Sequence, residues 1–167
     1  MARRTKRFSQ TGESRPAAKT VVHPTAEELR ARLRSTNTAR QFAFDVAEAS
    51  FGRVVLRMKI GDQHRQIHGV VHGGVMAALV DTAGGLATYM ALPRGTRTAT
   101  IELKINFLEG VEGGEVRADA RVVRMGRHIA VVDCDAHDHR GRLVAKALMT
   151  FFVGPFRKSR KGRKGTG

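Results

Sequence analysis

The sequence is poor in residues on which several classes of protein depend. It contains one cysteine, Cys134, one tyrosine and no tryptophan among 167 residues. A single cysteine excludes an internal disulfide framework and suits a reducing compartment, so we expect a cytoplasmic protein in which Cys134 serves packing. No apolar stretch approaches the roughly 20 residues that a membrane-spanning helix needs, and the N-terminus lacks the apolar centre of a secretory signal. We therefore expect no membrane insertion.

Acidic residues are also scarce, and the formal net charge is +15. The imbalance lies at the ends: residues 1–40 hold ten Lys or Arg against three acids, residues 154–167 hold six against none, and residues 41–153 are nearly neutral. We expect largely disordered basic tails that bind polyanions weakly and without specificity. Phe8 and Phe156 are too few to stack on single-stranded bases. An alternative for the Arg-, Ser- and Thr-rich start is an organelle transit peptide.

Hydrophobic periodicity predicts one α+β domain over residues 41–153. Alternation over residues 42–60 around Gly52 indicates a hairpin, and helical spacing from Gly74 to about Leu92 indicates a long buried helix. Strand-like runs follow at 98–108, 115–125, 128–137 and 142–152, and their short glycine-containing connections favour an antiparallel meander. We expect this sheet of about six strands to curl around the helix.

Two local patterns refine this prediction. Thr25 and Glu28 have the spacing of a capping box, which predicts a short helix to about Arg34 within the N-terminal tail. Gly84 and Gly85 stand inside the long helix, where each glycine costs about 1 kcal/mol relative to alanine. We therefore expect another element to approach the helix closely at these two positions.

The run from His72 to Asp81 combines two features with chemical uses. Gly73 and Gly74 leave the amides at the start of the helix unobstructed, and such amides stabilise a carbonyl oxygen that gains negative charge. Asp81, two turns later in an apolar helix, is costly unless it is paired or working. The alternative is structural: a helix-entry turn, and an aspartate used only for hydrogen bonding.

The distance along the helix keeps Gly73 and Asp81 of one chain apart. Eight positions of helix correspond to about 12 Å between Gly73 and Asp81, which is beyond one short side chain. If the two groups act on one bound molecule, the simplest arrangement is a two-fold homodimer in which Gly73 of one chain faces Asp81 of the other.

Residues 69–85, with His72-Gly73-Gly74 and Asp81, followed by residues 98–108, resemble the PaaI-type thioesterases of the hotdog superfamily. The resemblance covers roughly residues 42–153. It implies a hotdog fold, in which a long central helix is wrapped by a curved antiparallel sheet, and homodimers that pair into homotetramers. It also implies hydrolysis of acyl-CoA to free acid and coenzyme A, without a cofactor or metal.

The resemblance also assigns roles. Asp81 is expected to activate water as a base, or to attack as a nucleophile, and the Gly73 amide to bind the thioester carbonyl oxygen. His72 and Gly74 shape the substrate-binding turn, and Thr100 helps to place the water. Gln66 stands where many relatives carry an asparagine that assists the carbonyl, which leaves the rate and the substrate preference open.

The basic turn with Arg124 and Arg127 is a second candidate for substrate binding. Arginine makes planar, bidentate contacts with phosphate, so these two side chains suit the nucleotide phosphates of coenzyme A. Ordinary surface charge is the alternative.

Other clusters were weighed and disfavoured. His64, His68 and His72 have the spacing of a zinc-binding helical face, but the intervening glycine and valines disfavour a helix. The alternating Asp133, Asp135, His137 and His139 are better explained as a solvated hairpin tip.

The preferred function is hydrolysis of a medium-chain or aromatic acyl-CoA. One alternative is a hotdog enoyl-CoA hydratase or dehydratase, which usually needs a paired histidine and acid. The other is a non-catalytic acyl-CoA sensor with polyanion-binding tails.

Overall fold

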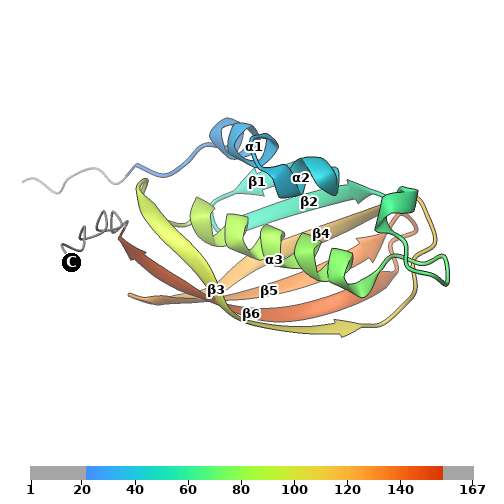
Figure 1. Ribbon diagram of the computed structural model, residues 1–167. Coiled ribbons are helices and arrows are strands. Elements are labelled where there is room, and N and C mark those ends of the chain that lie inside the picture. The colour runs from blue at the N-terminus through green and yellow to red at the C-terminus, as the bar shows by residue number, and fades with distance from the viewer. Residues whose placement is uncertain (1–21, 156–167) are drawn as a thin grey trace, which may run out of the picture.

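The structure, a computed structural model, describes residues 22–155. One long helix, α3, spans Gly73–Met90 and lies in the hollow of a curved six-stranded antiparallel sheet (Figure 1). The strands are β1 Phe44–Ser50, β2 Arg53–Lys59, β3 Thr96–Phe107, β4 Glu115–Met125, β5 Ile129–Asp138 and β6 Leu143–Pro155. The predicted α+β hotdog class and the order of elements are confirmed. None of the helices within residues 22–155 is long and apolar enough to cross a membrane.

The strand order, β1-β2-β4-β5-β6-β3, corrects the predicted meander. The hairpin of β1 and β2 and the run from β4 to β6 are as expected. However, β3 pairs with β6 at the far edge of the sheet, and β4 pairs back onto β2. The glycines at 113 and 114 mark where a connection turns, but they do not specify which edge receives the next strand. β3 is therefore an edge strand rather than a neighbour of β4.

Close packing under α3 explains its two internal glycines. A Cβ atom on Gly84 would lie 2.6 Å from Met149 Cε and 3.1 Å from Phe151 Cε2, and one on Gly85 would lie 3.5 Å from Phe151 Cε1. The expected close approach is confirmed, and the element that approaches is β6. On either side of this contact Ala83 and Ala87 are fully buried. Small residues thus allow α3 to sit directly on the sheet.

The packed unit begins upstream of the expected boundary at residue 41. Helix α1 spans Ala26–Arg34 and begins with the predicted capping box: Thr25 Oγ1 accepts from the Glu28 amide, and Glu28 accepts from the Thr25 amide. Leu29 and Leu33 are buried in the common core because they lie on one face of this helix. A second, five-residue helix, α2 at Asn37–Gln41, was not expected. The rest of the expected tails, residues 1–21 and 156–167, lies outside the described residues.

Asp138 stabilises the turn between β5 and β6 through hydrogen bonds. Its carboxylate accepts hydrogen bonds from the Arg140 and Arg142 amides, both at 2.9 Å, and from the Arg142 guanidinium. Burial alone raises the pKa of Asp138, but the hydrogen bonds outweigh it and lower the pKa to about 2. An unfolded aspartate titrates near 3.9, so this group stabilises the fold fully above about pH 4 and loses that contribution as the pH falls toward 2.

We therefore expect Asp138→Asn to weaken the acid sensitivity of the fold. Between pH 5 and pH 2.5, the urea midpoint should fall less in the variant than in the wild type. Asp62→Asn is the matched control, because Asp62 is an exposed carboxylate paired with Arg65. Equal falls in wild type and Asp138→Asn would contradict the assignment.

Candidate active site

Asp81 opens onto a pocket between α3 and β3. The Thr100 hydroxyl donates a 2.8 Å hydrogen bond to Asp81 Oδ1, so one carboxylate oxygen is held by β3. The pocket, termed here the Asp81 pocket, has a volume of about 520 Å³. The carboxylate is half-buried. Asp81 lies on the face of α3 that turns away from the core and toward the open edge of the sheet.

The walls of the Asp81 pocket come from three parts of the chain. One stripe of α3 contributes its half-buried residues, and β3 and β6 contribute residues facing them. A third contribution comes from α1, through Arg32. The lining consists of Arg32, Asp81, Thr82, Gly85, Leu86, Tyr89, Gly95, Arg97, Thr98, Ala99, Thr100 and Phe151.

Sequence reasoning missed five polar members of this pocket: Arg32, Tyr89 and Arg97, and the smaller Thr82 and Thr98. Tyr89 could have been found, because it follows Asp81 by eight positions and therefore shares its helical face. Arg97 lies within β3, but the predicted strand began at residue 98, so the sequence left Arg97 in a connection without a distinguishing motif. Arg32 comes from a separate helix 49 residues away in the sequence, and no local pattern relates it to Asp81.

The turn at the start of α3 is capped by a histidine side chain. His72 is the N-cap, and its Nδ1 accepts a 2.9 Å hydrogen bond from the Gly74 amide. The Gly73 amide, in contrast, has no hydrogen-bond partner among residues 22–155. A Cβ atom on Gly73 would lie 3.4 Å from the Phe107 ring, which is ordinary van der Waals contact. The Gly73 amide is thus a free donor at the positive end of a helix.

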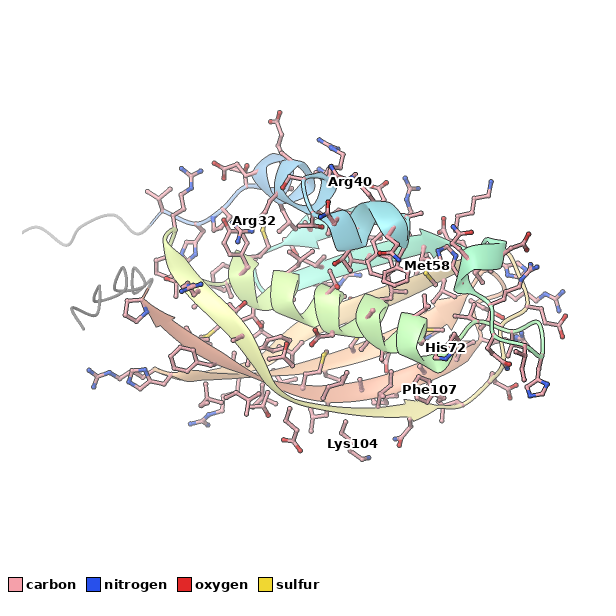
Figure 2. All side chains as sticks on the ribbon, viewed as in Figure 1. Arg32, Arg40, Met58, His72, Lys104 and Phe107 are labelled. Atoms are coloured by element: carbon pink, nitrogen blue, oxygen red, sulfur yellow. The ribbon has the colours of Figure 1, made fainter. Side chains whose placement is uncertain are left out.

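One chain does not bring Gly73 and Asp81 to a common pocket. Gly73 opens onto a separate pocket of about 250 Å³, lined in part by Phe107, whereas Asp81 lines the larger one. Figure 2 shows His72 and Phe107 together at the end of the molecule where α3 begins. α3 runs unbroken between the two residues, so the expected separation of about 12 Å holds.

Gln66 lies in the loop before α3. Its side-chain oxygen accepts a 2.7 Å hydrogen bond from the His68 amide. The oxygen is therefore used to shape the loop, which leaves the amide NH₂ as the group that can donate to a carbonyl oxygen.

Arg124 and Arg127 are exposed and lie far from Asp81 of the same chain. The strand register aligns Thr100 with Phe151, Ala130 and Met125 on successive strands. Three strand spacings of about 4.8 Å place the turn after Met125 about 14 Å from Thr100. These arginines therefore do not belong to the Asp81 pocket within one chain.

The three histidines of the predicted zinc alternative serve separate purposes. His64 is buried, and its Nδ1 accepts from the Gly61 amide at 2.9 Å. Burial lowers the pKa of His64, with partial opposition from the Phe42 carbonyl. His68 is exposed, His72 is the cap of α3, and Gly69 between them has φ +83°. Over residues 22–155 no group of three or more His, Cys, Asp or Glu side chains is arranged to hold a metal.

The remaining candidates are structural. Burial raises the pKa of Cys134 to about 12, so its thiol stays protonated and the expected packing role is confirmed. Asp133 and Asp135 lie within β5 rather than at a hairpin tip, and both bind Lys146 Nζ, at 3.2 and 2.7 Å.

Comparison with known proteins gives a consistent family. A sequence profile described as the thioesterase superfamily matches residues 68–145. A Saccharolobus solfataricus protein described as an esterase is 36% identical over 66% of this chain and 71% of its own length. Human acyl-coenzyme A thioesterase 13 is 26% identical over 77% of this chain and 96% of its own.

Solved structures agree with the sequence matches. A Haemophilus influenzae thioesterase superposes with a TM-score of 0.73 at 27% identity, and the match covers 78% of this chain and 91% of that one. A Streptococcus mutans protein bound to acetyl CoA superposes with a TM-score of 0.63 at 31% identity, covering 69% and 91%.

Proposed function

Because this chain belongs to the PaaI-type thioesterases of the hotdog superfamily, and so is an acyl-CoA thioesterase, we propose that it hydrolyses medium-chain or aromatic acyl-CoA at a site shared by two subunits. One observation carries the proposal: a half-buried carboxylate, Asp81, is held by Thr100 at the mouth of a pocket large enough for an acyl group. The acetyl CoA bound to the Streptococcus mutans protein supports coenzyme A as the leaving group.

We assign the carboxylate as a general base. The Thr100 hydroxyl donates to Asp81 Oδ1, and the other carboxylate oxygen, Oδ2, takes a proton from water. The hydroxide equivalent attacks the thioester carbonyl carbon, and the carbonyl oxygen becomes negative against the Gly73 amide of the second subunit. The intermediate then expels the coenzyme A thiolate, which takes the proton from Asp81, and leaves the free acid. Gln66, through its NH₂ group, supplies a second donor to the same oxygen.

The subunits are proposed to meet along β3. Within residues 22–155 this strand pairs on one side alone, with β6, and its outer edge is open. Ile101, Phe107 and Leu108 on or next to this strand are each half or more exposed, so apolar surface is available at this edge for a partner to cover. Pairing two β3 edges about a two-fold axis extends the sheet and brings the partner copy's α3 start toward Asp81. Such homodimers then pair into homotetramers.

The exposed Arg124 and Arg127 remain our candidates for the phosphates of coenzyme A. In the assembled dimer, the nucleotide part of bound coenzyme A extends from the site along the protein surface, outside the Asp81 pocket. An extended coenzyme A molecule is long enough to reach a turn about 14 Å from Thr100.

The test is thiol release from a panel of acyl-CoAs, with a medium-chain, an aromatic and an enoyl member. We expect stoichiometric release of coenzyme A and free acid from the first two, with no added metal or cofactor. Hydration of the enoyl member without thiol release would instead identify the hydratase alternative. Tight binding without turnover, together with nucleic-acid binding at physiological salt, would identify the sensor.

A further inference from the structure

Two unpartnered hydrogen-bond donors lie in the Asp81 pocket at the end away from Asp81. The Arg32 guanidinium carbon is 5.0 Å from the centroid of the Tyr89 ring, and both side chains line the pocket. Within residues 22–155, neither the guanidinium nor the Tyr89 hydroxyl makes a hydrogen bond or an ion pair. Tyr89 follows Asp81 by eight helical positions, so the two residues lie about 12 Å apart along α3.

Arg32 has no carboxylate partner within residues 22–155, whereas seven of the fifteen arginines in that range have one. Ion pairs with Asp or Glu engage Arg53, Arg57, Arg65, Arg94, Arg117, Arg121 and Arg142. A guanidinium that lines a pocket while its charge remains unmatched is a docking point for an anion.

Arg32 is held in place by the helix that carries it. The neighbouring Leu29 and Leu33 are buried in the core, which fixes the rotation of α1. Glu28, one turn before Arg32, forms a 2.6 Å ion pair with Arg94 in the turn after α3, which fixes the distance between the two helices. Contact with the Tyr89 ring then orients the guanidinium itself. Figure 2 shows Arg32 at the end of the molecule where α3 finishes, opposite His72.

We propose that Arg32 and Tyr89 bind a carboxylate at the far end of the acyl group, so that the preferred substrates are ω-carboxylated medium-chain acyl-CoAs. This inference rests on the proposed function. The two ends of the pocket carry opposite charges, Asp81 at one and Arg32 at the other. A carboxylated acyl group is repelled from the Asp81 end and attracted to the Arg32 end, which presents its neutral thioester to Asp81.

The same donors also exclude competitors. A methyl-ended acyl group of equal length covers Arg32 and Tyr89 without replacing the hydrogen bonds that water made to them, and unpaired polar groups of this kind penalise such an analogue. Because Arg32 is exposed, we expect about a tenfold preference rather than a much larger one.

The experiment compares substrates of equal length that differ only at the end: suberyl-CoA against octanoyl-CoA, and adipyl-CoA against hexanoyl-CoA. We expect the wild type to favour the carboxylated member by about tenfold in kcat/KM for at least one pair, and Arg32→Gln to abolish that ratio. Tyr89→Phe should lower the ratio by a smaller factor. Arg34→Gln is the matched control, because it removes the same charge from the last turn of α1 and lies outside the pocket.

A binding measurement separates this inference from the proposed function. Calorimetry with Asp81→Asn, alone and combined with Arg32→Gln, should show the same carboxylate preference and the same loss in Kd without turnover. Hydrolysis of all members with no carboxylate preference would overturn the inference and leave the proposed function standing. Equal weakening of both members of a pair, and of free coenzyme A, by Arg32→Gln would overturn it too, because Arg32 would then contact the phosphates. If no thioester is hydrolysed, the proposed function fails, and the Kd ratio alone decides the inference.

Discussion

Asp81→Asn is expected to lower kcat for a good acyl-CoA substrate by at least about a hundredfold, the usual worth of a positioned general base. The substitution keeps the shape of the side chain and its ability to accept the Thr100 hydrogen bond, but an amide does not take a proton from water. KM should change little, because the lost interaction belongs to the transition state. Stopped-flow detection of released thiol, with the oligomeric state checked by light scattering, gives both quantities.

Asp133→Asn is the matched control for this measurement. It removes a carboxylate from β5, and Lys146 retains its second partner, Asp135. Its turnover should stay within about twofold of the wild type. Full activity in Asp81→Asn would remove the carboxylate from the mechanism and return Asp81 to a purely structural role.

The parts of the fold that sequence periodicity predicted are those decided locally. The spacing of Leu79, Ala83 and Ala87 on α3 defined a buried helix, and the two internal glycines indicated close packing before β6 was known to supply it. The position of β3 was not predictable in this way. Strand pairing depends on which edges are free once the helix has crossed the sheet, and that is a property of the whole topology.

The candidate site likewise contains residues that local sequence predicts and residues that it does not. Its motif residues, from His72 to Asp81, lie in one continuous segment whose geometry follows from helix capping and helical rise. Arg32 was instead assigned to a tail, because the net positive charge of residues 1–40 outweighed the signal of two leucines four positions apart. Burial of Leu29 and Leu33 joins that segment to the domain and brings Arg32 to the pocket.

The second large effect is expected from removing the Gly73 amide without disturbing α3. Gly73→Pro does this, because proline lacks the N–H and is well tolerated at the first position of a helix. His72 has φ −66° and ψ 133°, the extended conformation that a residue before proline requires. Loss of one oxyanion donor should lower kcat by about a hundredfold to a thousandfold. Gly73→Ala keeps the amide and places a methyl group in ordinary contact with Phe107, so it should retain most of the activity.

Mixing the two inactive chains tests whether the amide and the carboxylate come from different subunits. In a dimer of one Asp81→Asn chain and one Gly73→Pro chain, the first supplies an intact amide and the second an intact carboxylate, so one of the two shared sites is complete. Random pairing of equal amounts makes half of the dimers mixed, and turnover should recover to about a quarter of the wild-type value per chain. Purification over two different affinity tags enriches the mixed assemblies, so turnover should rise above that quarter. If each chain instead used its own amide and carboxylate, every site would carry one lesion, and turnover would stay at the level of the two parents.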